Sequence, residues 1–463
     1  MFSSIKLAYN ISNINCIINE IYELDDNNLD LELVNKKLQY LKELVYKCGC
    51  IGIKFTQWYI SRINTHTDQI SKLMTDYFDD IFDNCPIHSL DQTRDIFLEE
   101  FNLYMDDIID MDTIELIGSG SIGQVYKAKF KKGDKTVAIK VKHPNVDNEI
   151  SMINPIIYTL SKLQNVNYFR NRYKLYCNFD EFLKNLKLQT NFVNEAFNCI
   201  RFKNLFDDNP LIYVPTIYYF TQNILISEYV DGDDYYNLTE YGKLKTAYNL
   251  FCFAQESILI NNFIHGDLHK KNWKVKLVDE KYQLVLYDFG ICFRTLDVEL
   301  GRKIWHGFEN QDIRTVIDIF KKHLIIGNFT QEMSYEIEEL YQYFTSQKFD
   351  MNIVINKIIS IMSKKENVML DQTLLNIIIY FNLIEKIFIE NDIISSELKN
   401  DVIGYSNVAR NMRFELLSYC KANKSYPKLV DYLEAKLDND VSKSSFSLFS
   451  EVGVSDLVFT PPE

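Results

Sequence analysis

Apolar residues recur every three or four positions over the first quarter of the chain, and this spacing predicts helices. Few β-branched runs interrupt the pattern. The clearest series comprises Leu31, Val34, Leu38, Leu41, Leu44 and Val45. We therefore expect residues 1–111 to be helical.

From Asp112 onward the pattern becomes typical of strands. A strand-like run, a Gly-rich turn and an alternating stretch follow one another between Thr113 and Val141, and the turn at Gly133 predicts an antiparallel pair. The helical pattern returns at Asp297. Shorter strand-like runs in between lie at 223–230, 273–277 and 283–287.

These changes of pattern divide the 463 residues into four parts. We expect a helical extension at 1–111, a β-rich lobe at 112–232, a helical lobe at 233–402, and a final helix with a Ser-rich tail at 403–463. At roughly 150 residues per folding unit, the length suits this division. The order predicts an α+β fold with two lobes behind a helical extension.

Charge and cysteine content narrow the class of protein. The chain has 50 Lys plus Arg, 64 Asp plus Glu and a net charge of −14. This balance argues against nucleic acid as a partner, because phosphate binding needs a cationic surface.

Nine irregularly spaced Cys indicate free thiols in a reducing compartment. The N-terminus has no targeting pattern, and the most apolar stretch, 374–389, falls short of the ~20 residues of a membrane span. We predict a cytoplasmic protein.

A glycine-rich segment with the pattern G-x-G-x-x-G-x-V is the sharpest local motif. A dinucleotide fold places such glycines between a strand and a helix, whereas a kinase places them in a turn between antiparallel strands. Strand-like residues lie on both sides here, so the kinase arrangement is favoured. Glycine lets a backbone approach phosphate oxygens because it has no Cβ. The nucleotide-binding candidates are Gly118, Ser119, Gly120, Ser121, Gly123 and Val125.

Three further motifs follow in the order found in kinases. A V-A-I-K strand ends at Lys140, the type of lysine that contacts the α- and β-phosphates. Asp267 lies in an H-G-D-L sequence and Asn272 follows it by five residues, the spacing of a kinase catalytic loop with Gly in place of Arg. Asp288 begins an Asp-Phe-Gly tripeptide. Together the motifs predict a site for ATP, with Mg²⁺ held by Asn272 and Asp288 and with Asp267 beside the acceptor.

A kinase also needs a carboxylate that pairs with Lys140. Glu195, in an amphipathic Asn-Glu-Ala stretch, is the candidate, although Glu181 fits the same pattern. Glu195 follows Lys140 by 55 residues, a long connection for a protein kinase. A zinc site from His265 and His269 is a competing interpretation of the catalytic loop, but it lacks a third nitrogen or sulfur ligand nearby.

In detail the motifs resemble the UbiB-like atypical kinase family, the ubiquinone-biosynthesis-associated relatives of protein kinases. Residues 121–128 resemble its S-I-G-Q-V-x-x-A, and residues 137–146 its V-A-V-K-V-x-H-P-x-V. Residues 194–202 resemble its N-E-A-x-N-x-x-R-F, which supports Glu195, and residues 265–272 correspond to its H-x-D-x-H-x-x-N. The resemblance covers about residues 40 to 330. It implies a bilobal protein-kinase-like fold that binds ATP and Mg²⁺.

The resemblance also reaches the helical extension. Lys54 to Gln57 resemble the family's K-x-G-Q helix, and Lys54, Gln57 and Ser61 share one helix face. In the family this helix folds over the active site and occupies the space of a peptide substrate. That placement implies a small-molecule or lipid acceptor, or ATP hydrolysis. The chain departs from the family where Thr56 replaces a glycine and where Gly-Ser-Gly-Ser at 118–121 replaces an Ala-rich loop. No A-P-E motif follows the Asp-Phe-Gly tripeptide.

We therefore interpret the chain as an atypical kinase or ATPase that uses ATP and Mg²⁺. Its expected catalytic residues are Lys140, Glu195 and Asp267. Two other classes stay open: a protein serine/threonine kinase, which the Gly-rich loop favours, and a nucleotide-binding pseudokinase scaffold. The lysines between 127 and 142 could meet an anionic membrane surface or could be solvated residues of a hairpin.

Overall fold

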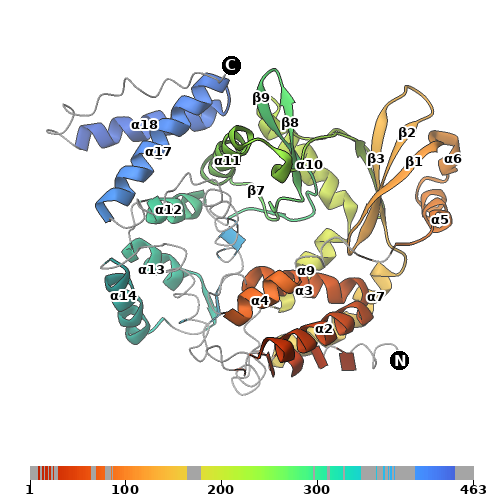
Figure 1. Cartoon of the computed structure of the whole chain (residues 1–463), viewed down its shortest axis with the longest axis horizontal. Coiled ribbons are helices and arrows are strands. Elements are labelled where there is room, and N and C mark those ends of the chain that lie inside the picture. The colour runs from red at the N-terminus through yellow and green to blue at the C-terminus, as the bar shows by residue number, and fades with distance from the viewer. Residues whose placement is uncertain are drawn as a thin grey trace.

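The structure is a computed structural model of the whole chain. It describes residues 30–63, 69–78, 87–163, 179–295, 298–309, 313–326, 329–345 and 402–443, and scattered residues at 9–24, 85 and 361–380. Figure 1 shows a β-rich lobe on one side, a helical lobe on the other, and the N-terminal helices along the lower edge. The predicted α+β, two-lobed fold is confirmed. Most of the apolar stretch at 374–389 and the tail beyond 443 lie outside the described residues.

The N-terminal helices are α2 (Leu31–Lys47), α3 (Gly49–Ile63) and α4 (Gln69–Tyr77). Helix α2 begins at Asp30, whose carboxylate accepts hydrogen bonds of 3.1 Å from two first-turn N–H groups. The apolar face predicted from the sequence is buried: Val34, Leu38, Leu41, Leu44 and Val45 are each 3% exposed or less. They form the core of the extension with residues of α3 and α4.

A five-stranded antiparallel sheet in the order β1-β2-β3-β6-β5 forms the β-rich lobe. Its elements are α5 (Leu90–Phe101), α6 (Met105–Ile108), β1 (Ile109–Ser119), β2 (Gly123–Phe130), β3 (Thr136–Lys142), β5 (Ile217–Phe220) and β6 (Ile224–Glu228). Strand β1 begins at Ile109, so it crosses the boundary expected at 111. Phe97 of α5 shares a core with Val137 and Ile139 of β3. We therefore propose that this lobe begins at α5.

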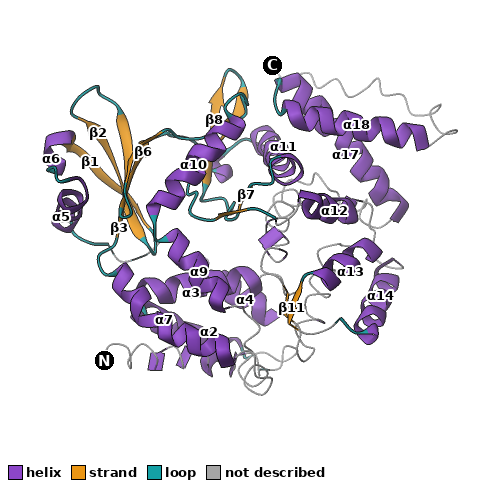
Figure 2. Cartoon of the chain, turned by 180° about the vertical axis from the view of Figure 1, so that it is seen from behind, coloured by secondary structure: helices purple, strands orange, loops and turns teal. Residues whose placement is uncertain are grey.

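Three helices lie in the described part of the long connection between β3 and β5. They are α7 (Val146–Leu163), α9 (Phe179–Gln189) and α10 (Phe192–Phe206). Helix α10 begins at Asn191, whose side chain accepts a hydrogen bond of 3.1 Å from Val193 N–H. Seen from behind in Figure 2, α10 runs between the sheet and the helical lobe.

The helical lobe surrounds a small three-stranded sheet in the order β4-β9-β8. None of the helices in the part of the chain that the structure describes is both long and apolar enough to cross a membrane. The strands of the helical lobe are β4 (Ile212–Tyr213), β7 (Ile264–His265), β8 (Trp273–Val278), β9 (Lys281–Leu286), β10 (Cys292–Phe293), β11 (Leu324–Ile326) and β12 (Met369–Leu370). Its helices are η2 (Tyr235–Asn237), α11 (Glu240–Gln255), the π-helical η3 (Glu256–Ile260), α12 (Val298–Glu309), α13 (Ile313–Lys322), α14 (Gln331–Thr345), α17 (Val402–Asn423) and α18 (Pro427–Lys443).

An aromatic cluster joins α10 to the helical lobe. The ring of Phe202 on α10 lies 5.9 Å from that of Phe253, 4.8 Å from that of Phe263 and 5.4 Å from that of Phe289, between centroids. Phe202 is fully buried. Because Phe289 belongs to the Asp-Phe-Gly tripeptide, this cluster fixes that segment relative to α10.

We expect Phe202→Ala to destabilise the protein by about 3–5 kcal/mol, because it leaves a large cavity in this cluster. The measurement is the denaturant midpoint followed by tryptophan fluorescence. Phe197→Ala on the same helix is the matched control, since Phe197 is 58% exposed, and it should cost under ~1 kcal/mol. Equal losses in the two variants would contradict this role of the cluster.

Candidate nucleotide and metal site

The glycine-rich segment forms the turn between β1 and β2. Gly118 pairs with Val125 and Ser119 with Gln124, and Gly120 N–H donates a 2.9 Å hydrogen bond to Gly123 O. A Cβ at Gly118 would meet nothing within 4 Å, whereas one at Gly123 would lie 2.5 Å from the carbonyl oxygen of Val141. Close approach of β3 therefore requires glycine at 123. Open space at 118 is what a loop over phosphates needs.

Lys140 lies at the centre of the sheet, paired with Val125 of β2 and Leu225 of β6. Its ammonium lies 2.8 Å from both carboxylate oxygens of Glu195 and 3.6 Å from Oδ2 of Asp288. Glu195 is in the first turn of α10 and only 4% exposed. The structure thus brings together three residues from β3, α10 and the Asp-Phe-Gly tripeptide. The side chain of the alternative, Glu181, lies outside the described part of the chain.

Burial and charge act against each other on this group of three. Burial alone would lower the pKa of Lys140, but the charges of Asp288 and Glu195 raise it above its usual value. Burial raises the pKa of Glu195 to about 7, while Lys140 opposes that rise. The pKa of Asp288 stays below its usual value, because Lys140 and Lys54 outweigh the effect of burial. The ammonium is therefore held as a cation between two carboxyl groups.

The catalytic loop is fixed by a buried neutral histidine. His265 is fully buried, its Nε2 donates to the carbonyl oxygen of Tyr287 at 3.1 Å, and its Nδ1 accepts from Asp267 N–H at 3.4 Å. Burial lowers the pKa of His265, in keeping with a neutral ring. A Cβ at Gly266 would lie 2.7 Å from Cγ2 of Ile291. The glycine that replaces the usual arginine is thus explained by the segment after Asp-Phe-Gly, which passes close to the loop.

Asp267 has a partner that the sequence did not assign to it. Nε2 of His269 lies 3.5 Å from Oδ2 of Asp267 and 3.1 Å from the side-chain nitrogen of Asn272. Burial would raise the pKa of Asp267, but His269 and Lys54 lower it well below its usual range. Asp267 raises the pKa of His269 in turn, against the effect of burial. Asp267 and His269 are two residues apart in the H-x-D-x-H pattern, and this spacing is the one feature of the sequence that could have indicated their contact.

Asn272 and Asp288 carry the oxygen atoms that suit Mg²⁺. Asn272 donates from its amide nitrogen to the backbone oxygen of Asp267 at 2.8 Å, and Tyr287 N–H donates to Asn272 O at 2.8 Å. The second bond ties the catalytic loop to the segment that carries Asp288, which has a positive φ of 48°. Among the described residues, no group of three or more His, Cys, Asp or Glu side chains is placed so that it could hold a metal ion. The zinc interpretation of His265 and His269 gains no third ligand there. One carboxylate and one amide do fit Mg²⁺, which keeps waters and uses phosphate oxygens.

Helix α3 brings a further cation to this site. The charge of Lys54 acts on Glu195, Asp267 and Asp288, and lowers the pKa of each. Gln57 is one turn further along the same helix and half-buried. Thr56 is buried and its hydroxyl donates to the carbonyl oxygen of Gly52 at 2.9 Å, so its own helix satisfies it. The side chain of Ser61 lies outside the described part.

The same helix packs against the glycine-rich loop. Ile122 of the loop is 8% exposed and shares a core with Cys50 and Ile51 of α3 and with Val146 and Ile150 of α7. The extension therefore shares a core with the loop over the site, and the charge of Lys54 acts on the carboxylates within it.

Four of the lysines between 127 and 142 have separate partners. Lys142 is buried and donates to Asp147 and to the carbonyl oxygen of Thr190. Lys129 pairs with Asp134 at 2.9 Å. Lys127 lies over the ring of Tyr229, 4.5 Å from its centroid, and Lys135 over that of Tyr218, at 5.2 Å. These separate partners favour the interpretation as residues of a hairpin.

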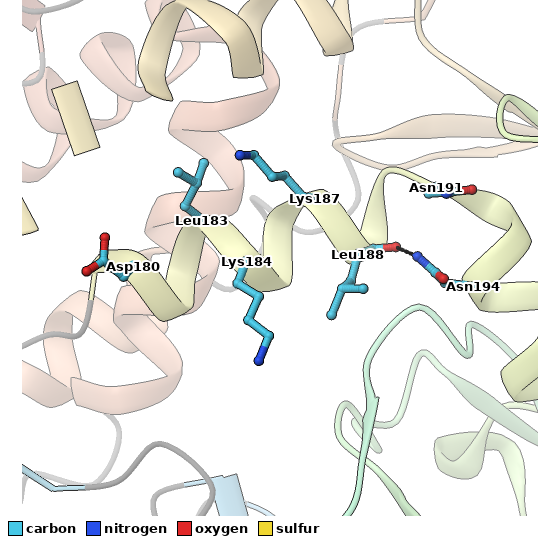
Figure 3. Close-up of a pocket in the computed structure, with 7 residues that line it drawn as sticks. All are labelled: Asp180, Leu183, Lys184, Lys187, Leu188, Asn191 and Asn194. Carbon is cyan, nitrogen blue, oxygen red and sulfur yellow. Dashed lines mark hydrogen bonds between the residues drawn. The ribbon is translucent and has the colours of Figure 1, made fainter. Parts of the chain in front are cut away.

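A hollow of about 490 Å³ lies along α9 (Figure 3). It is lined by residues between Asp180 and Asn194, and none of the residues predicted from the sequence to form the site lines it. Figure 3 shows Lys184 and Lys187 leaving α9 in different directions. Asn194 donates to the backbone oxygen of Leu188 at 3.1 Å. The hollow therefore offers no convergent set of polar groups.

Taken with the two-lobed fold, the lysine–glutamate pair, the catalytic loop and the Asp-Phe-Gly segment define a protein-kinase-like domain. Residues 80–320, slightly more than half of the chain, match the family model described as the ABC1 atypical kinase-like domain. The chain belongs to this family. The predicted resemblance to UbiB-like atypical kinases is confirmed.

Relatives from several organisms share this region. The chain is 28% identical over 252 residues to "Probable serine/threonine-protein kinase abkC" of Dictyostelium discoideum, an alignment of 52% of this chain and 35% of that protein. It is 29% identical over 268 residues to "Protein ACTIVITY OF BC1 COMPLEX KINASE 8, chloroplastic" of Arabidopsis thaliana, covering 55% and 34%. The chain thus spans well under two thirds of these proteins. A solved Mycobacterium tuberculosis protein in complex with erythromycin aligns with 66% of this chain and 80% of its own, at 16% identity and a TM-score of 0.45.

The pKa of Glu195 near 7 predicts how nucleotide binding depends on pH. Only ionised Glu195 pairs with Lys140, so the affinity for Mg·ATP should fall as the pH decreases through about 7. Lys54 lowers this pKa, so Lys54→Met should move the acidic limb to higher pH. The measurement is a calorimetric titration between pH 5.5 and 8.5. Lys47→Met, at the end of α2, is the matched control and should leave the limb in place. An acidic limb that moves to lower pH in Lys54→Met would refute this assignment.

Proposed function

We propose that the chain binds Mg·ATP and transfers the γ-phosphoryl group to a small-molecule or lipid acceptor, or to water. The observation that supports this most is the Lys140 ammonium, 2.8 Å from Glu195 and 3.6 Å from Asp288. In kinases that arrangement orients the phosphates and holds the metal.

Each residue has a role that follows from its position. The loop at 118–123 would cover the phosphates, and Lys140, held by Glu195, would orient them. Asn272 and Asp288 would hold Mg²⁺, which neutralises the charge that develops on the transferred group. Asp267 lies in the catalytic loop with its side chain 33% exposed, and against the effect of burial His269 and Lys54 lower its pKa well below the usual range, so it would accept a hydrogen bond from the attacking hydroxyl or water. Catalysis of this kind depends mainly on positioning.

The extension favours a small acceptor over a protein. Helix α3 packs against the glycine-rich loop and directs the charge of Lys54 at the catalytic carboxylates. A helix in that position competes with a peptide chain for access. A protein serine/threonine kinase is the second candidate, because a Dictyostelium relative carries that name. A pseudokinase scaffold is the third, and it has less support because the lysine, both carboxylates and the asparagine are all present in one site.

Replacing Asp288 by Asn should reduce Mg·ATP-dependent turnover at least ~100-fold, because the site loses the charge that holds the metal. A coupled assay of ADP release measures this. Asp431→Asn on the surface of α18 is the matched control and should retain full turnover. If Asp288→Asn turned over ATP at the normal rate, Asp288 would not be the metal ligand.

The class of acceptor is decided by one comparison. We expect the purified protein to consume ATP faster in the presence of liposomes or quinone-like phenols, and not to phosphorylate a generic protein in trans. Anionic and neutral liposomes, tested in parallel by flotation, report on membrane contact of a protein that we propose to be cytoplasmic. Efficient phosphorylation of the protein substrate would instead favour the serine/threonine kinase. Stabilisation by Mg·ATP without any consumption would favour the scaffold.

A further inference from the structure

The glycine-rich loop is held by a pair of histidines that the proposed chemistry does not use. His143 follows β3, and its Nε2 lies 2.9 Å from the carbonyl oxygen of Gly120 and 3.5 Å from Oγ of Ser119. Its Nδ1 lies 2.8 Å from Nδ1 of His88, which precedes α5. The two rings meet edge to face, with centroids 5.0 Å apart. The loop is thereby connected to the segment in front of the sheet.

The contact continues into the core of the β-rich lobe. Nε2 of His88 lies 2.9 Å from Oγ1 of Thr93, which lies 3.0 Å from the hydroxyl of Tyr126. That hydroxyl accepts a hydrogen bond from the amide nitrogen of Gln124. Gln124 also exchanges two bonds of 3.0 Å with the backbone of His88, one from His88 N–H and one to His88 O. Thr93 and Gln124 are fully buried.

These distances are consistent with one direction of donation along the whole chain of contacts. A backbone carbonyl only accepts, so Nε2 of His143 carries its hydrogen and its Nδ1 accepts from His88. Nε2 of His88 then accepts from Thr93, which accepts from Tyr126, which accepts from Gln124. The two backbone bonds of Gln124 fix the orientation of its amide and hence the direction of the series. Every donor in it has an acceptor while both rings are neutral.

The electrostatics agree with neutral rings. Burial and, to a smaller extent, the charge of His143 together lower the pKa of His88 to about 4. Burial also lowers the pKa of His143, although the bond to Gly120 opposes this. A proton added to His143 would go to Nδ1 and place two N–H groups face to face across the 2.8 Å contact, and one added to His88 would go to Nε2, which accepts from Thr93.

We propose that His143 is a positioning residue for the nucleotide: it holds the Gly120 carbonyl in a hydrogen bond, so that this oxygen does not turn toward the phosphates. A carbonyl oxygen facing phosphate oxygens repels them, whereas the N–H groups of such a loop attract them. The series from Gln124 through His88 fixes the ring that makes the bond. This inference rests on the proposed binding of Mg·ATP, and it gives a role to Gln124 and His143, which lie in the two family-like motifs at 121–128 and 137–146.

The test compares full-length wild type with His143→Leu, His143→Gln and Thr93→Val. Two readouts are taken: amide hydrogen exchange of residues 118–123, and kcat and KM for ATP. We expect His143→Leu to speed loop exchange and raise KM, each about tenfold, with kcat changed less than ~3-fold. His143→Gln, whose amide can donate to Gly120, should recover most of both effects. Thr93→Val should give a smaller rise of about threefold, and His323→Leu, in the helical lobe, should give none.

Two results would overturn the inference. One is a His143→Leu protein with wild-type loop exchange and KM. The other is a fall in kcat together with a rise in KM in His143→Leu that His143→Gln does not reverse, which would indicate a general structural role. If His143→Leu fails to fold, the other two variants decide. Near-wild-type loop exchange and KM in His143→Gln with a threefold rise in Thr93→Val support the inference, and wild-type values in Thr93→Val overturn it. A wild-type protein that binds no Mg·ATP would refute the proposed function, whereas loop exchange would still show whether His143 holds the loop.

Discussion

The ammonium of Lys140, between the carboxylates of Glu195 and Asp288, is the interaction on which the rest of the structure depends. The side chain of Glu195 is 5% exposed and that of Lys140 is 20% exposed, so removal of either leaves the other poorly compensated, whereas that of Asp288 is 45% exposed. Each charge comes from a different element: β3, α10 and the Asp-Phe-Gly segment. The ion group therefore requires those three elements to meet at one point. The aromatic cluster around Phe202 provides the packing that keeps them there.

This requirement explains the long connection between β3 and α10. Lys142, two residues beyond Lys140, is buried and bonded to the carbonyl oxygen of Thr190, just before α10 begins. Helices α7 and α9 lie in this interval, and residues of both share with α3, α10 and β6 the core that contains Ile122 of the glycine-rich loop. The insertion therefore gives the extension a surface on which to pack. In this way the N-terminal helices become part of the site although they lie outside both lobes in sequence.

The sequence predicted which residues would lie near one another better than the contacts that hold them there. Short motifs with strict spacing pointed to Lys140, Asp267, Asn272 and Asp288 as candidates, because each motif is local. The sequence did not predict the contact of Asp267 with His269. It also did not predict that residue 123 must be glycine because β3 passes close to it, and not because a phosphate does. Those depend on which segments meet in space. The same holds for the start of the β-rich lobe, since α5 reads as one more amphipathic helix until its contact with the sheet is known.

The distribution of charge sets the acidic chain apart from its own site. With a net charge of −14, the protein as a whole repels anions. Mg·ATP is itself an anion, so attraction has to be local and buried, where charges interact more strongly than in water. Lys140 supplies one fixed cation. Lys54 supplies a second, and it comes from a helix that packs against the loop over the site. Under the proposed function, α3 contributes charge to the carboxylates and shares a core with the loop, so its placement would affect both the electrostatics and the cover of the site.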